Sequence, residues 1–116
     1  MSTFRASVSA GESGPVIMLS GESDLSSVAE LSDLVTAQLS GATRHLTIDV
    51  SGMTFADSAS IRVLMLAAVT LQKRGGGLVL LRPQRALTRV LDIMDTEELI
   101  TIRGKEEAEA PDGCGP

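Results

Sequence analysis

The chain has 116 residues, of which 43% are apolar and 2% aromatic, with neither Trp nor Tyr, and its formal net charge at pH 7 is −5. One domain with an aliphatic core is therefore expected. The acidic balance, and the lack of aromatic rings that could stack on bases or sugars, argue against nucleic acid or glycan ligands and favour a protein partner.

The single cysteine and the N-terminal composition bear on location. Cys114 is the only cysteine, so no intrachain disulfide and no cysteine-based metal cluster can form, which fits a reducing compartment. Residues 1–14 lack the apolar core of a signal peptide, and no stretch approaches the roughly 18 uncharged apolar residues of a membrane span. We expect a cytoplasmic protein that makes no membrane contact.

The first part of the chain predicts a β-hairpin and then a helix. Residues 4–10 alternate loosely, GESGP is typical of a turn, and the unbroken apolar run 16–19 predicts a strand covered on both faces. The segment SGESDL predicts a loop with a helix N-cap at Asp24 or Ser26, and a helical pattern then continues until Gly41. The apolar positions of this helix are Leu25, Val28, Leu31, Leu34, Val35 and Leu39.

The middle of the chain predicts a strand followed by a long helix. Residues 45–50 alternate apolar and polar side chains up to a turn at Ser51-Gly52. From Ser58 an apolar stripe indicates a second helix, which the three glycines at 75–77 end.

The last part predicts a buried strand at 78–81 and a third helix that starts at Pro83, whereas 99–102 is either an edge strand or the end of a short helix. We expect a domain over 1–103 and a disordered acidic tail over 104–116, which is rich in Gly and Pro. The alternation of strands and helices implies an α/β fold with parallel later strands and an antiparallel first strand.

Ser58 follows Asp57 where a strand pattern gives way to a helical one, and it could be a nucleophile, a helix cap or a phosphate acceptor. A nucleophile needs a base, but the one histidine, His45, lies at the start of a predicted strand, and no G-x-S-x-G motif is present. Hydrolase chemistry is therefore disfavoured. We interpret His45 as an exposed strand-end residue, because no second His or Cys lies at metal-ligand spacing.

Four carboxylates fall at or near the C-terminal ends of predicted strands. They could converge as an acid/base pair or a site for a hard metal, because open α/β sheets place their sites at this edge. The alternative, which we favour, is that Asp24 caps the first helix, Asp57 caps the second and Asp49 faces solvent. The four residues are Glu22, Asp24, Asp49 and Asp57.

A hydroxyl in the first turn of a helix points toward backbone amides that carry roughly half a positive charge. Phosphorylation of Ser58 would add about −1.5 to −2 charge at a place where the fold tolerates it. A partner docked on the uncharged form would instead face a dianion beside Asp57 and Asp24. The site is therefore predicted to act as a binding switch.

Three segments together resemble the STAS domain of bacterial anti-sigma factor antagonists, also called anti-anti-sigma factors. They contain the G-E-x-D turn ending at Asp24, the D-x-S-x-x-x-F-x-D-S pattern ending at Ser58, and a Gly-rich turn before L-V-L. The resemblance implies a mixed sheet of four to five strands with helices packed mainly on one face, and a non-enzymatic protein without metal or cofactor. The segments are VIMLSGESDL at 16–25, HLTIDVSGMTFADSASIRVL at 45–64 and GGGLVLLRPQRALTRVLDIMDTEELITI at 75–102.

The resemblance also implies a switch. In this family the serine after the aspartate, here Ser58, is phosphorylated by the cognate anti-sigma factor, an ATP-dependent serine kinase. The unphosphorylated form binds that kinase and frees a sigma factor, and a serine phosphatase restores binding after phosphorylation. Asp57, Asp24 and Glu22 would shape the acceptor site. The expected partner surface consists of Ser58, Ala59, Arg62, Met65, Leu66 and Val69.

The chain departs from the family pattern after the acceptor. Members usually carry D-S-[ST]-G-L, whereas Ala59, Ser60 and Ile61 follow Ser58 here. Ser60 is a second candidate acceptor, but helical geometry turns it about 200° away from Ser58, which favours Ser58. The departure supports an alternative function as a non-switching STAS scaffold subunit of a larger signalling or lipid-transport assembly. The oligomeric state, monomer or weak dimer, stays open.

Overall fold

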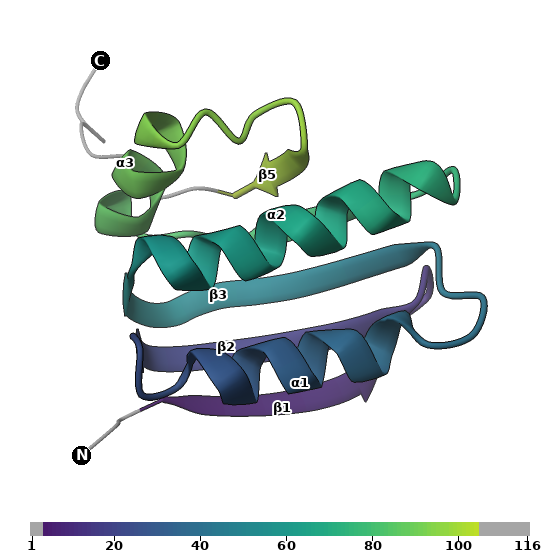
Figure 1. Cartoon of the computed structure of the whole chain (residues 1–116), viewed down its shortest axis with the longest axis horizontal. Helices are drawn as coiled ribbons and strands as arrows, with labels where there is room; N and C mark the ends of the chain where they lie inside the picture. The colour runs from purple at the N-terminus through teal and green to yellow at the C-terminus, as the bar shows by residue number, and fades with distance from the viewer. Residues whose placement is uncertain (1–3, 105–116) are drawn as a thin grey trace.

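Five strands form one sheet in which each strand lies beside the next strand of the chain (Figure 1). The computed structural model describes residues 4–104. Its elements, in chain order, are β1 (Arg5–Ala10), β2 (Pro15–Ser23), α1 (Val28–Leu39), β3 (His45–Ala56), α2 (Ser58–Lys73), β4 (Gly77–Leu81), α3 (Arg85–Ile93) and β5 (Ile100–Arg103). The α/β class expected from the sequence is confirmed.

The sheet is mixed, as predicted. β1 runs antiparallel to β2, and β2, β3, β4 and β5 are parallel to one another. Right-handed crossovers that all step in the same direction place their helices on the same side of a sheet. In Figure 1, α1 and α2 lie side by side across the strands, and both helices begin at the end where β2 and β3 finish. The β2–α1 and β3–α2 connections therefore meet at one edge of the sheet.

The core lies between the sheet and these two helices. Leu46 and Ile48 of β3 are fully buried, as are Ile61 and Leu64 of α2. Burying a side chain of this size stabilises the fold by roughly 1.5–3 kcal/mol. These contacts fix α2 on the sheet, and with it the position of the first helical turn.

β2 and β3 are both longer than the sequence predicts. β2 extends to Ser23 and β3 to Ala56, and the register between the two strands shifts twice. Such shifts are bulges that let a strand continue with a bend. At one of them a Cβ on Gly52 would lie 2.9 Å from the Cβ of Ser20, so a side chain has no room there. Gly52 therefore marks a bulge, and the turn predicted at this place is wrong.

Two helices begin later than predicted. α1 begins at Val28, so Leu25 lies outside the helix and is 78% exposed. α3 begins at Arg85 and does not include Pro83. The chain turns at Arg82, whose φ of 55° is positive, before the helix can start.

Coverage of the strands also differs from the expectation. The strand predicted to be buried on both faces is covered on one face only, since Met18 of β2 is 51% exposed. The segment 99–102, for which strand and helix were both open, contributes the edge strand β5. The glycine triplet ends α2 as predicted, with Gly75 at a φ of 84°.

Two further expectations concern the C-terminal tail and membrane-spanning helices. Apart from Gly104, the tail predicted over 104–116, with Cys114, lies outside the described residues. Among residues 4–104, no helix combines the length and the apolar character needed to cross a membrane.

Candidate functional site at the start of α2

Asp57 and Ser58 form the junction between β3 and α2. Asp57 is the N-cap, with extended backbone at φ −85° and ψ 177°, and its Oδ1 accepts a hydrogen bond of 2.9 Å from the Ser60 amide. The cap predicted for Asp57 is therefore present. Ser58 is the first helical residue, and its side chain is exposed. The hydroxyl thus lies in solvent at the positive end of a helix of 16 residues.

Ser60 lies on the other side of the same turn, in the interior. Its Oγ is 2.7 Å from the Oγ of Ser23 and 3.2 Å from the Ser23 carbonyl oxygen, and only 1% of the residue is exposed. The Asp57 amide donates to the same Ser23 carbonyl at 3.0 Å. The end of β2 is thus bonded to both ends of the first turn of α2. Because the Ser60 hydroxyl is sealed in the core, the structure argues against Ser60 as the second acceptor.

Asp24 directly follows Ser23, which places it at the same edge as Asp57. Its Oδ1 accepts hydrogen bonds from the Ser26 hydroxyl at 2.7 Å and the Ser26 amide at 2.9 Å. These bonds hold the pKa of Asp24 below its usual value, so the carboxylate is charged at neutral pH. The N-cap of α1 is Ser27, and it makes no side-chain cap bond. The expected helix cap at Asp24 is therefore wrong, because its carboxylate closes the preceding turn.

Glu22 and two apolar side chains lie near this edge. Glu22 is exposed and pairs in register with Phe55 of β3. Phe55 is 47% exposed, and Leu25 protrudes from the β2–α1 connection. The helical and strand patterns assign no function to Phe55 or Leu25. The signal that could have identified these two residues is that Leu25 follows Asp24 in the sequence and Phe55 closely precedes Asp57. Exposed apolar side chains around a polar cluster are typical of a protein-binding surface.

The predicted partner residues on α2 divide into two sets. Ser58, Arg62 and Leu66 recur every four residues and form an exposed row, in which Leu66 is 63% exposed. Met65 and Val69 are half-buried, as is Ala59 of the first turn. A groove of about 290 Å³ runs beside Leu66 between the two helices, and its lining is Ser32, Val35, Thr36, Leu39, Val63, Leu66, Ala67 and Thr70.

Asp49 does not join the other carboxylates. It lies in the middle of β3, opposite Met18, and is 5% exposed. Its carboxylate forms a salt bridge with the Arg82 guanidinium and accepts a hydrogen bond of 2.9 Å from the Ser51 amide. Burial raises the pKa of Asp49, but the hydrogen bonds from Ser51 and the charge of Arg82 outweigh it and lower the pKa overall. Both the convergent site and the solvent-facing position expected for Asp49 are therefore wrong.

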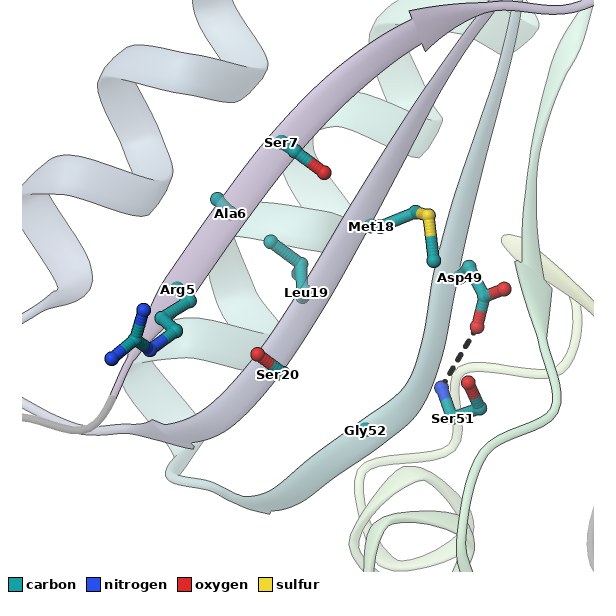
Figure 2. Close-up of a pocket in the computed structure, with 9 residues that line it drawn as sticks. All are labelled: Arg5, Ala6, Ser7, Met18, Leu19, Ser20, Asp49, Ser51 and Gly52. Atoms are coloured by element: carbon teal, nitrogen blue, oxygen red, sulfur yellow. Dashed lines mark hydrogen bonds between the residues drawn. The ribbon is translucent and has the colours of Figure 1, made fainter.

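Figure 2 shows where Asp49 lies instead. Its side chain points with Ser7 and Met18 to the face of the sheet opposite α1 and α2. A hollow of about 270 Å³ is present on this face. Sequence patterns do not predict the Arg82 partner of Asp49. Asp49 pairs with Leu81 in the parallel register, and Arg82 follows Leu81 directly. The hollow is lined by Arg5, Ala6, Ser7, Met18, Leu19, Ser20, Asp49, Ser51 and Gly52.

His45 is too far from Ser58 to act as its base, and the described part of the chain contains no candidate metal cluster. His45 is exposed at the first residue of β3, and Ser58 follows the far end of that strand of 12 residues. Between residues 4 and 104, no group of three or more His, Cys, Asp or Glu side chains could hold a metal ion. The site is an exposed hydroxyl beside the Asp57 cap, at the edge of the sheet that also carries Asp24 and exposed apolar side chains, which suits recognition by another protein.

Comparisons with known proteins identify the family. A family model described as Mlab, STAS domain, matches residues 6–101. Among curated protein sequences, none matches the chain. An anti-sigma factor antagonist from Mycobacterium paratuberculosis has a similar crystal structure, with a TM-score of 0.78 and 20% identity over 87% of this chain and 86% of that chain.

Two further structures share the fold. The cell fate determinant SpoIIAA of Bacillus in its phosphorylated form has a TM-score of 0.67 and 18% identity over 93% of this chain and 95% of that chain. A chain in the complex of the diguanylate cyclase SiaD with its activator SiaC from Pseudomonas aeruginosa has a TM-score of 0.52 and 18% identity, covering 88% and 93%. The family model spans most of the sequence, and the chain therefore belongs to the STAS domain family.

Proposed function

We propose that this protein is a cytoplasmic, non-enzymatic anti-sigma factor antagonist. In its unphosphorylated form it binds an anti-sigma factor that is also a serine kinase, and phosphorylation of Ser58 releases it. The observation that carries the proposal is the exposed Ser58 hydroxyl in the first turn of α2, next to the cap formed by Asp57. The similar fold of an anti-sigma factor antagonist and of a phosphorylated SpoIIAA supports it.

The switch follows from charge. Transfer of the γ-phosphoryl group of ATP to the Ser58 oxygen releases ADP and a proton and adds about −1.5 to −2 charge. The N-terminus of α2 favours an anion, so the domain keeps its fold. The carboxylates of Asp24 and Asp57 already lie at this edge. A partner packed against Leu25, Phe55 and Leu66 would have to desolvate the new dianion, which weakens binding.

Binding of the anti-sigma factor to variants of Ser58 tests the proposal. Ser58→Asp should raise the Kd at least tenfold and leave the circular dichroism spectrum unchanged, because it places a charge at the docking surface only. Ser9→Asp is the matched control, since Ser9 is exposed on β1 and pairs with Val16 at the far end of the sheet. Equal Kd values for the parent and Ser58→Asp would refute the charge switch.

A second candidate function is a STAS scaffold subunit that does not switch. Two observations favour it: Ser60 stands at a position where the family pattern has Gly, and the fold is also similar to that of a chain in the cyclase–activator complex. Purification from native cells separates the two functions. An anti-sigma factor kinase should accompany an antagonist, whereas a transport or signalling assembly without such a kinase should accompany a scaffold.

A further inference from the structure

Ser23 and Ser60 form a buried hydroxyl pair that links elements 37 residues apart in the sequence. Both residues are sealed, with 0% and 1% of their surface exposed. One arrangement of hydrogens satisfies both: the Ser60 hydroxyl donates to the Ser23 carbonyl at 3.2 Å and accepts from the Ser23 hydroxyl at 2.7 Å. A buried hydroxyl with two partners is held in one rotamer.

Capping of α2 does not require this pair. The Asp57 carboxylate already accepts the Ser60 amide, and the Ser60 hydroxyl points in a different direction, toward β2. β2 and β3 stay paired up to Ser23 and Ala56, although their register shifts twice before that point, and the hydroxyl pair adds a side-chain bond from the end of β2 to α2. The pair therefore supplies a contact that neither the helix nor the sheet would make by itself.

Two hydrogen bonds to Ser23 hold the chain on either side of Ser58. On one side of Ser58 the Asp57 amide donates to the Ser23 carbonyl at 3.0 Å, and on the other side the Ser60 hydroxyl donates to the same oxygen. The backbone of Ser58 and Ala59 lies between these two attachments. The Asp24 turn directly follows Ser23, so its distance from Ser58 is set by the same bonds.

We propose that Ser23 and Ser60 act as a positioning latch, which holds Ser58 and the Asp24 turn in the arrangement that the kinase recognises. The inference rests on the proposed function. Neither latch residue receives the phosphate. Their effect is to reduce the motion that the kinase would otherwise have to restrict before transfer, as pre-organised substrates do.

A double variant separates positioning from stability. Ser60→Ala alone would leave the Ser23 hydroxyl unsatisfied in the core, whereas replacing both serines by Ala removes the pair with little loss of stability. We expect Ser23→Ala/Ser60→Ala to unfold in urea close to the parent midpoint. Its kcat/KM for phosphorylation by the cognate anti-sigma kinase should be about fivefold lower, the size of one net hydrogen bond. Amide hydrogen exchange at Asp57 and Ser60, whose amides donate to the Ser23 carbonyl and the Asp57 carboxylate, should be faster.

Thr96→Val is the matched control. Thr96 is 1% exposed, and its hydroxyl donates to the Leu91 carbonyl at 3.3 Å in the connection from α3 to β5. This variant should lose stability with an unchanged kcat/KM. A double variant that is phosphorylated as fast as the parent would overturn the latch. If the parent itself accepts no phosphate, the proposed function fails, and the exchange rates then decide whether the latch holds the first turn of α2.

Discussion

At the scale of the residue, Asp57 has two roles, helix capping and charge, which different substitutions can separate. Its carboxylate caps α2, and its charge lies beside Ser58. Asp57→Ala should lower the free energy of unfolding by about 1 kcal/mol, as loss of an N-cap does, whereas Asp57→Asn should cost less than about 0.5 kcal/mol because Asn is an equally good cap. Urea unfolding measures both. An Asp57→Asn variant as unstable as Asp57→Ala would show that loss of the helix cap does not cause the loss of stability.

The buried Asp49 should make the stability of the fold depend on pH. Its pKa is lowered from 3.8 because the bonds from Ser51 and the charge of Arg82 outweigh the effect of burial. A carboxyl with a lower pKa in the folded state stabilises the fold above the unfolded-state pKa, and this contribution is lost as the pH falls through the folded-state pKa.

Asp49→Asn should therefore be less stable than the parent at pH 7, and the difference should shrink as the pH falls below about 4. Urea unfolding between pH 7 and pH 2.5 measures this difference. Arg82→Ala should reduce the same pH dependence, because it removes the cation that favours the charged form. A stability difference between parent and Asp49→Asn that is constant over this range would contradict the ion pair's contribution.

At the scale of the element, the turn between α2 and β4 depends on close backbone contact. The Gly77 amide donates to the Arg44 carbonyl at 3.0 Å, and a Cβ on Gly76 would lie 1.8 Å from that carbonyl oxygen. Gly76→Ala should therefore cost at least about 2 kcal/mol, since the backbone must move. A Cβ on Gly77 meets nothing within 4 Å, so Gly77→Ala should stay within about 0.5 kcal/mol of the parent. Equal unfolding midpoints for the two variants would contradict this account.

The order and type of the elements could be predicted because each carries a local signal. The apolar stripe from Ile61 to Leu71 gives α2, and the alternation after His45 gives β3. At Gly52 the sequence predicts a turn where the structure has a bulge, because both use Gly, and only pairing with Ser20 distinguishes them. The Ser23–Ser60 and Asp49–Arg82 contacts join distant parts of the chain, so no local pattern could reveal them.

At the scale of the whole molecule, parallel strands and helices on one side bring the β2–α1 and β3–α2 connections to one edge (Figure 1). Ser58, the carboxylates of Asp24 and Asp57, and the exposed apolar side chains thereby lie at one edge, outside the core. Phosphorylation there should leave the urea midpoint nearly unchanged, because an anion in the first turn of a helix is favoured by about 0.3–1 kcal/mol. A large fall in the midpoint of the phosphorylated form would contradict a switch confined to the surface.

Identification of the phosphorylated residue is the most direct test of the central claim. The full chain and its Ser58→Ala variant are incubated with the cognate anti-sigma kinase and ATP, and the products are mapped by mass spectrometry. We predict one phosphate on Ser58 of the parent and none on the variant, with Ser60 unmodified in both. Phosphate transfer to Ser58→Ala at the rate of the parent would contradict the account.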